Sequence, residues 1–109
     1  MPKKINTKLP YYAVIFTSKK AKNTEGYNTM SRKMVQSVKN QEGFLGFESA
    51  REDIGITVSY WKDLKSIERW KNDIEHQKAQ KLGKELWYEW YRIRIAKVEK
   101  EYEYKTDSI

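Results

Sequence analysis

Histidine and tryptophan are the residues of this sequence with the most specific chemistry. His76 is the single histidine among 109 residues, and it follows Trp70 by six positions. A histidine can accept a proton or ligate a metal near neutral pH. On the apolar side of a helix it can equally be a hydrogen-bonded packing residue. The sequence leaves both interpretations of His76 open.

Aromatic residues are more numerous than a small core requires. The chain has four Trp, eight Tyr and three Phe, and each large ring buries about 150–250 Å². We therefore expect some of these rings to face a ligand or a partner. The candidate substrate contacts are Tyr11, Trp61, Trp87 and Tyr91, and a clustered tyrosine hydroxyl could also relay a proton. Packing in the core is the alternative role for each ring.

The residue inventory disfavours several enzyme classes. One histidine and no cysteine do not make a two-histidine iron site or a typical zinc site. The sequence has no phosphate-binding glycine loop and no Gly-x-Ser-x-Gly motif. Hydrolase, kinase and dehydrogenase activities are therefore not predicted, and no metal site is predicted apart from His76 as a candidate ligand to heme iron.

Lysine accounts for much of the formal net charge of +7. Most lysines alternate with glutamate, which is typical of a solvated surface, and no nucleic-acid-binding module is recognisable. The opening MPKKINTKLP has no apolar signal core, and no apolar run approaches the length of a membrane span. We therefore predict a cytoplasmic protein that binds neither nucleic acid nor membrane. The lack of cysteine is compatible with a reducing compartment.

Apolar periodicity predicts six main elements. A strand is expected at 11–17, a helix capped by Asn23 or Thr24 and ending before Gly43, a hairpin of two strands before and after Gly55, and a last strand at 91–102. Between the hairpin and the last strand, the apolar stripe changes sides. The helical region should therefore break near Asn72 and Asp73, giving a short helix and a longer one whose stripe extends to Trp90.

This order predicts an α+β, ferredoxin-like βαββαβ fold with a four-stranded antiparallel sheet. We expect residues 1–109 to form a single domain, with a core at about 11–102 and flexible ends at 1–9 and 105–109. The helices can cover one face of the sheet, but the strands carry apolar residues on both faces. A second copy of the chain is the expected cover of the other face, which predicts a homodimer.

Several segments resemble the antibiotic biosynthesis monooxygenase (ABM) domain family, in particular its bacterial group with heme-degrading members. They are GFLGFESAR at 43–51, the pair Tyr60 and Trp61, the run EHQKAQKLGKELWYEWY at 75–91, and IAKVEKEY at 95–102. The resemblance implies a dimeric α+β barrel with a pocket between sheet and helices. It also implies either cofactor-free oxidation of a small aromatic substrate by dioxygen, or heme degradation with a histidine ligand.

The resemblance to the heme-degrading members is incomplete at single positions. Trp70 matches a family tryptophan, but the first strand lacks their asparagine, and their ligand position falls near Ala79 or Gln80, one turn after His76. We therefore predict a monooxygenase with Trp70 and His76 as catalytic residues. No cofactor is required, although heme could be its substrate or ligand, with His76 as the ligand to the iron. The alternative is a non-catalytic ligand-binding or stress-associated dimer.

Overall fold

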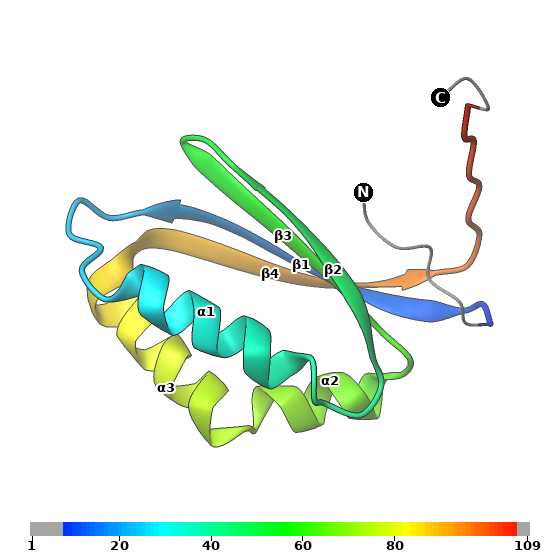
Figure 1. Ribbon diagram of the computed structural model, residues 1–109, viewed down its shortest axis with the longest axis horizontal. Helices are drawn as coiled ribbons and strands as arrows, with labels where there is room; N and C mark the ends of the chain where they lie inside the picture. The colour runs from blue at the N-terminus through cyan, green and yellow to red at the C-terminus, as the bar shows by residue number, and fades with distance from the viewer. Residues whose placement is uncertain (1–7, 107–109) are drawn as a thin grey trace.

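Alternating apolar residues form a four-stranded antiparallel sheet in the order β2-β3-β1-β4. The strands are β1 (Tyr11–Lys20), β2 (Phe44–Arg51), β3 (Ile54–Trp61) and β4 (Tyr88–Val98). This computed structural model describes residues 8–106, apart from the side chains of Ile74 and Glu75 (Figure 1). The strand with apolar residues on both faces, β1, lies in the interior of the sheet.

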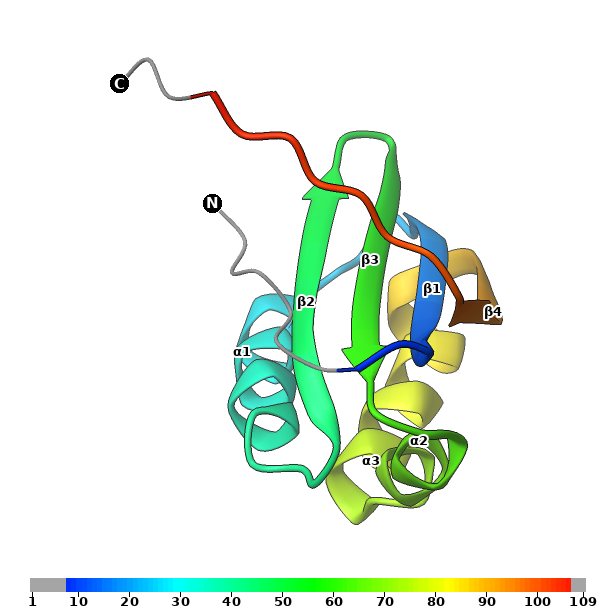
Figure 2. The same ribbon diagram turned by 90° about the vertical axis from the view of Figure 1, so that its right-hand side faces the viewer.

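The helices α1 (Tyr27–Val38), α2 (Leu64–Lys71) and α3 (Ile74–Leu82) lie together on one side of the sheet (Figures 1 and 2). The predicted α+β, ferredoxin-like fold is therefore confirmed. No helix within residues 8–106 is long and apolar enough to cross a membrane. The expectation of flexible ends concerns residues that lie mostly outside the described range, and it stays a prediction.

The first helix begins later than predicted. Neither Asn23 nor Thr24 caps it, since its N-cap is Gly26 with a φ of 84°. Asn23 instead accepts a hydrogen bond from the Glu25 backbone, and the Thr24 carbonyl accepts one from Tyr27. The two polar residues thus form a turn before the helix rather than its cap.

The predicted break near residues 72 and 73 is confirmed. Asp73 lies between α2 and α3, and its carboxylate accepts a hydrogen bond from the His76 backbone at 3.3 Å. The prediction that Trp90 belongs to the second helix is wrong. A π-helical turn at Gly83–Trp87 ends the helical region, and β4 begins at Tyr88. Gly83 permits this turn, since a Cβ there would lie 2.9 Å from the Tyr88 ring.

A bulge in β2 changes the face of one aromatic residue. The register with β3 shifts between Phe44 and Gly46, so that Phe44 pairs with Trp61 and Phe47 pairs with Ser59. Phe44 and Phe47 therefore lie on the same face, although strict alternation predicted opposite faces. Both rings face the helices, and their centroids are 6.4 Å apart.

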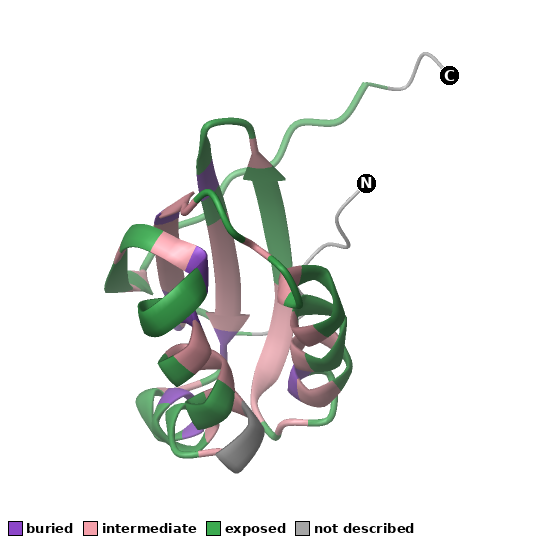
Figure 3. Cartoon of the chain, turned by 90° about the vertical axis from the view of Figure 1, so that its left-hand side faces the viewer, coloured by how far each residue is buried: buried purple, intermediate pink, exposed green. Residues whose placement is uncertain are grey.

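The buried core lies where the sheet meets α1 and α2. Val38, Trp61 and Ile67 form its centre, and partly buried side chains of Tyr12, Val14, Phe44 and Trp70 pack against it. Figure 3 shows the buried segments between the layers and the exposed ones on the outer helix surfaces. This core occupies one end of the layer between sheet and helices.

Candidate functional site

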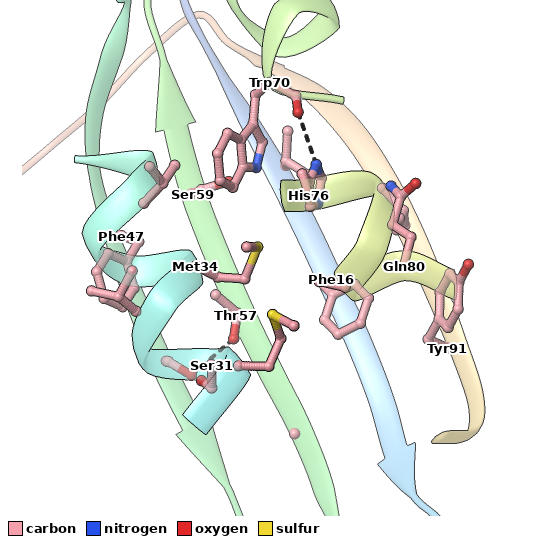
Figure 4. A pocket seen from close by; sticks show the side chains of 18 of the residues that line it. Phe16, Ser31, Met34, Phe47, Thr57, Ser59, Trp70, His76, Gln80 and Tyr91 are labelled. Carbon is pink, nitrogen blue, oxygen red and sulfur yellow. Dashed lines mark hydrogen bonds between the residues drawn. The ribbon is translucent and has the colours of Figure 1, made fainter. Parts of the chain in front are cut away.

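A cavity of about 500 Å³ lies between the sheet and the helices α1 and α3. Its walls are largely apolar and include Met30, Met34, Phe16, Phe47 and Ile93. Figure 4 shows side chains from strands and helices converging on this space. A concave, mostly apolar cavity with a few polar groups is the usual form of a small-molecule site.

His76 enters the cavity from the first turn of α3. Its Nδ1 lies 3.0 Å from the backbone oxygen of Trp70 (Figure 4). A carbonyl oxygen can only accept a hydrogen bond, so Nδ1 carries the proton. The lone pair of the neutral ring is therefore on Nε2, which can accept a proton or ligate a metal.

Burial lowers the pKa of His76 below its usual value of 6.5, although the Trp70 carbonyl and Asp73 both oppose this shift. The ring is therefore neutral at neutral pH. Gln80 lies one turn further along the same face of α3 and also lines the cavity. The break at Asp73 determines this arrangement, because it fixes where α3 starts.

Trp70 connects the histidine to the core. Its ring stacks on His76 at 4.5 Å and 14°, and on Trp61 at 6.3 Å and 30°. Trp70 and His76 both line the cavity, and their catalytic role stays a prediction. Trp61 is fully buried behind Trp70, donates its indole N–H to Ser59 Oγ, and does not line the cavity.

Trp87 and Tyr91 line the other end of the cavity. Trp87 donates its indole N–H to the Glu25 backbone oxygen at 2.9 Å, which holds the start of β4 against the start of α1. The Tyr91 ring lies 5.4 Å from that of Phe16. Tyr88 joins this cluster, and burial together with the Tyr27 hydroxyl raises the pKa of Tyr88.

Tyr11 lies on the opposite face of the sheet from the cavity. Alternation along β1 places Val14 and Phe16 toward the helices and Tyr11 away from them. Its hydroxyl donates to Glu101 at 2.5 Å, and burial and that carboxylate raise the pKa of Tyr11. The candidate substrate contacts are thus divided between the cavity, the core and the outer face.

Arg51 is a cavity residue that the sequence analysis did not select. Its guanidinium donates to the buried Ser18 Oγ at 2.5 Å and lies against Gly55. Arg51 and Gly55 line the end of the cavity near Tyr88. Strand alternation could have identified Arg51, since it is four residues after Phe47 and therefore lies on the same face of β2. A charged residue on the helix-facing side of a strand is unusual.

The structure offers a single-residue ligand position rather than a multidentate metal site. Within residues 8–106, no group of three His, Asp or Glu side chains is arranged to hold a metal ion. Nε2 of His76 is the donor that could ligate the iron of a heme. Its Nδ1–H is held by a carbonyl, which is also how metal-ligating histidines are oriented.

Comparison with known proteins gives two similar sequences. The chain is 48% identical over 94 residues to the Bacillus subtilis protein YqjZ, covering 84% of this chain and 82% of YqjZ. It is 29% identical over 92 residues to a jasmonate monooxygenase ABM of Pyricularia oryzae. That alignment covers 80% of this chain but only 43% of the fungal protein.

Similar solved structures support the same fold. A conserved protein from Methanosarcina mazei has a TM-score of 0.74 at 14% identity, over 84% of this chain and 95% of that one. SnoaB, described as a cofactor-independent oxygenase from Streptomyces nogalater, has a TM-score of 0.71 at 9% identity. The match covers 84% of this chain and 95% of SnoaB. The family model for antibiotic biosynthesis monooxygenase matches residues 10–82. With its ferredoxin-like sheet and the cavity beneath it, the chain belongs to the antibiotic biosynthesis monooxygenase family.

Proposed function

We propose that this protein is a monooxygenase that oxidises a small electron-rich phenol with dioxygen and without a bound cofactor. The observation that carries the proposal is His76, a neutral histidine whose Nε2 has the free lone pair beside an apolar cavity. A neutral imidazole with a free lone pair can accept a proton from a bound substrate. The names of SnoaB and the fungal relative support the reaction class.

In the proposed reaction, Nε2 of His76 removes the phenol proton. The phenolate then passes one electron to dioxygen, and the resulting radical pair combines to form a carbon–oxygen bond at the ring. His76 returns its proton to the outer peroxide oxygen. Loss of the ring hydrogen and cleavage of the oxygen–oxygen bond give a quinone and water, so that one phenol and one dioxygen yield one quinone and one water.

The remaining cavity residues would position the substrate and exclude water. Trp70 holds the imidazole by stacking, and Trp87 and Tyr91 offer ring surfaces at the other end. An apolar environment strengthens the electrostatic interactions of the phenolate with nearby dipoles. In this proposal the protein supplies a base and a shaped cavity, and the electrons come from the substrate.

The direct test is oxygen consumption with a panel of naphthols. We expect dioxygen uptake equal to quinone formation, and ¹⁸O₂ should place one labelled oxygen in the quinone and one in water. Hydrogen peroxide as the product would indicate an oxidase. Binding of the naphthols without oxygen uptake would favour the alternative of a non-catalytic binding protein.

Heme is a second ligand class that His76 favours, because its free Nε2 is the type of donor that binds heme iron. A bound heme would supply the oxygen chemistry itself. Titration with hemin should then shift the Soret band, and the shift should disappear in His76→Ala. An unchanged Soret band in the unmodified protein would remove this candidate.

We also propose that the protein is a homodimer formed through the outer face of the sheet. Ile54 and Ile56 are 38% and 46% exposed on that face, and burying each large apolar side chain stabilises a contact by about 1.5–3 kcal/mol. Light scattering at micromolar concentration should give the mass of two chains. Ile56→Asp should produce a monomer, whereas Leu64→Asp on the helix side, where Leu64 is 53% exposed, should not. A monomeric unmodified protein would contradict this proposal.

A further inference from the structure

Arg51 brings a positive charge to the apolar cavity. Beyond the bulge in β2, alternation places Phe47, Ser49 and Arg51 on the side that faces the helices. The Arg51 side chain lies across Gly55 of the neighbouring strand, where any Cβ would collide with the guanidinium. The lack of a side chain at residue 55 thus leaves the space in which the guanidinium lies.

Neutral groups of the protein hold this guanidinium in place. Arg51 donates through Nη2 to the Ser18 hydroxyl at 2.5 Å and through Nη1 to the Ser18 carbonyl at 3.5 Å. Ser18 is fully buried, so its position is fixed by β1. A guanidinium has five N–H donors, and Ser18 uses two of them.

Within residues 8–106, no carboxylate lies within ion-pair distance of Arg51. The adjacent Glu52 and Asp53 are exposed in the turn between β2 and β3. A partly buried charge without a counter-ion is costly, and a bound anion removes that cost. The charge of Arg51 is therefore available to a ligand in the cavity.

Arg51 and His76 lie at opposite ends of the cavity. Ser59 marks the histidine end, since it bonds the indole of Trp61, which stacks on Trp70 beside His76. Gly55 marks the arginine end, and the four residue steps from Gly55 to Ser59 along β3 span about 13 Å. Thr57 lies between these two positions on β3, and Met34 and Thr57 both line the cavity (Figure 4).

We propose that the cavity binds an elongated aromatic acid, with its carboxylate on Arg51 and its reactive ring beside His76. The guanidinium matches a carboxylate in charge and planar geometry, and the apolar walls match the body of such a molecule. The oxidation of the ring in this inference rests on the proposed monooxygenase function. Binding of the acid depends on Arg51 and the cavity alone.

The test is anaerobic binding measured by calorimetry at pH 7.5, so that turnover plays no part. The probes are 6-phenylhexanoate and 6-phenylhexanol, which differ in the charged group but have similar length. We expect the unmodified protein to bind the acid at least about tenfold more tightly than the alcohol. In Arg51→Gln the preference should fall below about twofold.

Two further variants separate the charge from the fold. Arg32→Gln removes the same charge from an exposed position on α1 and should keep the tenfold preference. Gly55→Ala keeps the charge but displaces the guanidinium, so it should lose most of the preference. Circular dichroism and thermal melts of each variant verify that it is folded, and Gly55→Ala tests the proposal should Arg51→Gln not fold.

Equal binding of acid and alcohol, a preference that survives Arg51→Gln, or no binding of either probe would overturn the inference. The proposed monooxygenase activity can fail separately. Preferential acid binding without oxygen uptake by any phenol would support the acid site and remove the oxygenase. Oxygen uptake with neutral naphthols but no preference for the acid would support the oxygenase and remove the acid site.

Discussion

The two faces of the sheet use polar residues in opposite ways. On the outer face, the hydroxyls of Tyr11 and Tyr60 donate to the carboxylates of Glu101 and Glu48 at 2.5 and 2.6 Å. In the cavity, the Nε2 of His76 is left free by the bond that its other ring nitrogen makes. Polar groups that are satisfied within the chain stabilise the fold, whereas groups with spare capacity are available to a ligand.

The pKa shifts differ between the faces in the same way. Burial and the Glu48 carboxylate raise the pKa of Tyr60 to about 12, so its hydroxyl stays protonated at neutral pH. Burial lowers the pKa of His76, so its ring stays neutral. The tyrosines of the outer face are therefore not proton acceptors, whereas His76 in the cavity is one.

The largest expected effect is on catalysis. His76→Gln keeps a polar side chain in the cavity but removes the base, so the rate of quinone formation should fall by about 10²–10⁴-fold. Tyr11→Phe on the outer face should change that rate less than twofold. Stopped-flow measurement of quinone absorbance with a naphthol substrate compares the two variants.

A similar loss of rate in both variants would contradict the difference between the faces. Retention of full activity by His76→Gln would show that the substrate loses its proton to another group. Rescue of the rate in this variant by added imidazole would strengthen the assignment of His76 as the base.

A smaller effect is expected on stability. Tyr11→Phe removes a hydrogen bond to a carboxylate, and because Glu101 is exposed, we expect a loss of about 1 kcal/mol in the free energy of unfolding. Tyr91→Phe in the cavity should change this free energy by less than about 0.5 kcal/mol, since no hydrogen bond of the Tyr91 hydroxyl is found within residues 8–106. Urea denaturation measures both. A larger loss of unfolding free energy in Tyr91→Phe than in Tyr11→Phe would mean that the Tyr91 hydroxyl, in the cavity, is the one that stabilises the fold.

The smallest effect is the pH dependence that His76 adds to stability. The folded pKa of His76 is below the unfolded value of about 6.5, so the unfolded chain binds the proton more readily. The contribution of His76 to the free energy of unfolding is fully present above pH 6.5. It is lost as the pH falls toward the pKa of His76 in the folded protein. Urea titrations at several pH values give the free energy of unfolding as a function of pH. This dependence should be flatter for His76→Gln than for the unmodified protein. Identical profiles would indicate an unshifted histidine.

The sequence predicted the sheet because alternation and turn residues act locally. The β2–β3 hairpin and the break near Asp73 follow from such signals. The bulge at Gly46 and the early start of β4 at Tyr88 were missed, because both depend on packing between distant segments, such as the contact of Gly83 with Tyr88.

The candidate site was predictable only in part. Trp70 and His76 could be selected by residue type and helical spacing, and both line the cavity. Arg51 was missed because its charge suggested a surface position, although its parity on the strand pointed inward. Tyr11 and Trp61 were selected as aromatic residues, but the strand face and the depth of the core place them outside the cavity.

The central claim is that His76 is a neutral base with its lone pair on Nε2. Since it is the single histidine of the chain, ¹⁵N-histidine labelling of untagged protein gives one imidazole to observe in a long-range ¹H–¹⁵N correlation spectrum. We predict the Nδ1-protonated tautomer at pH 7 and a titration midpoint below 6.5. An Nε2-protonated ring, or a midpoint above 6.5, would contradict the account.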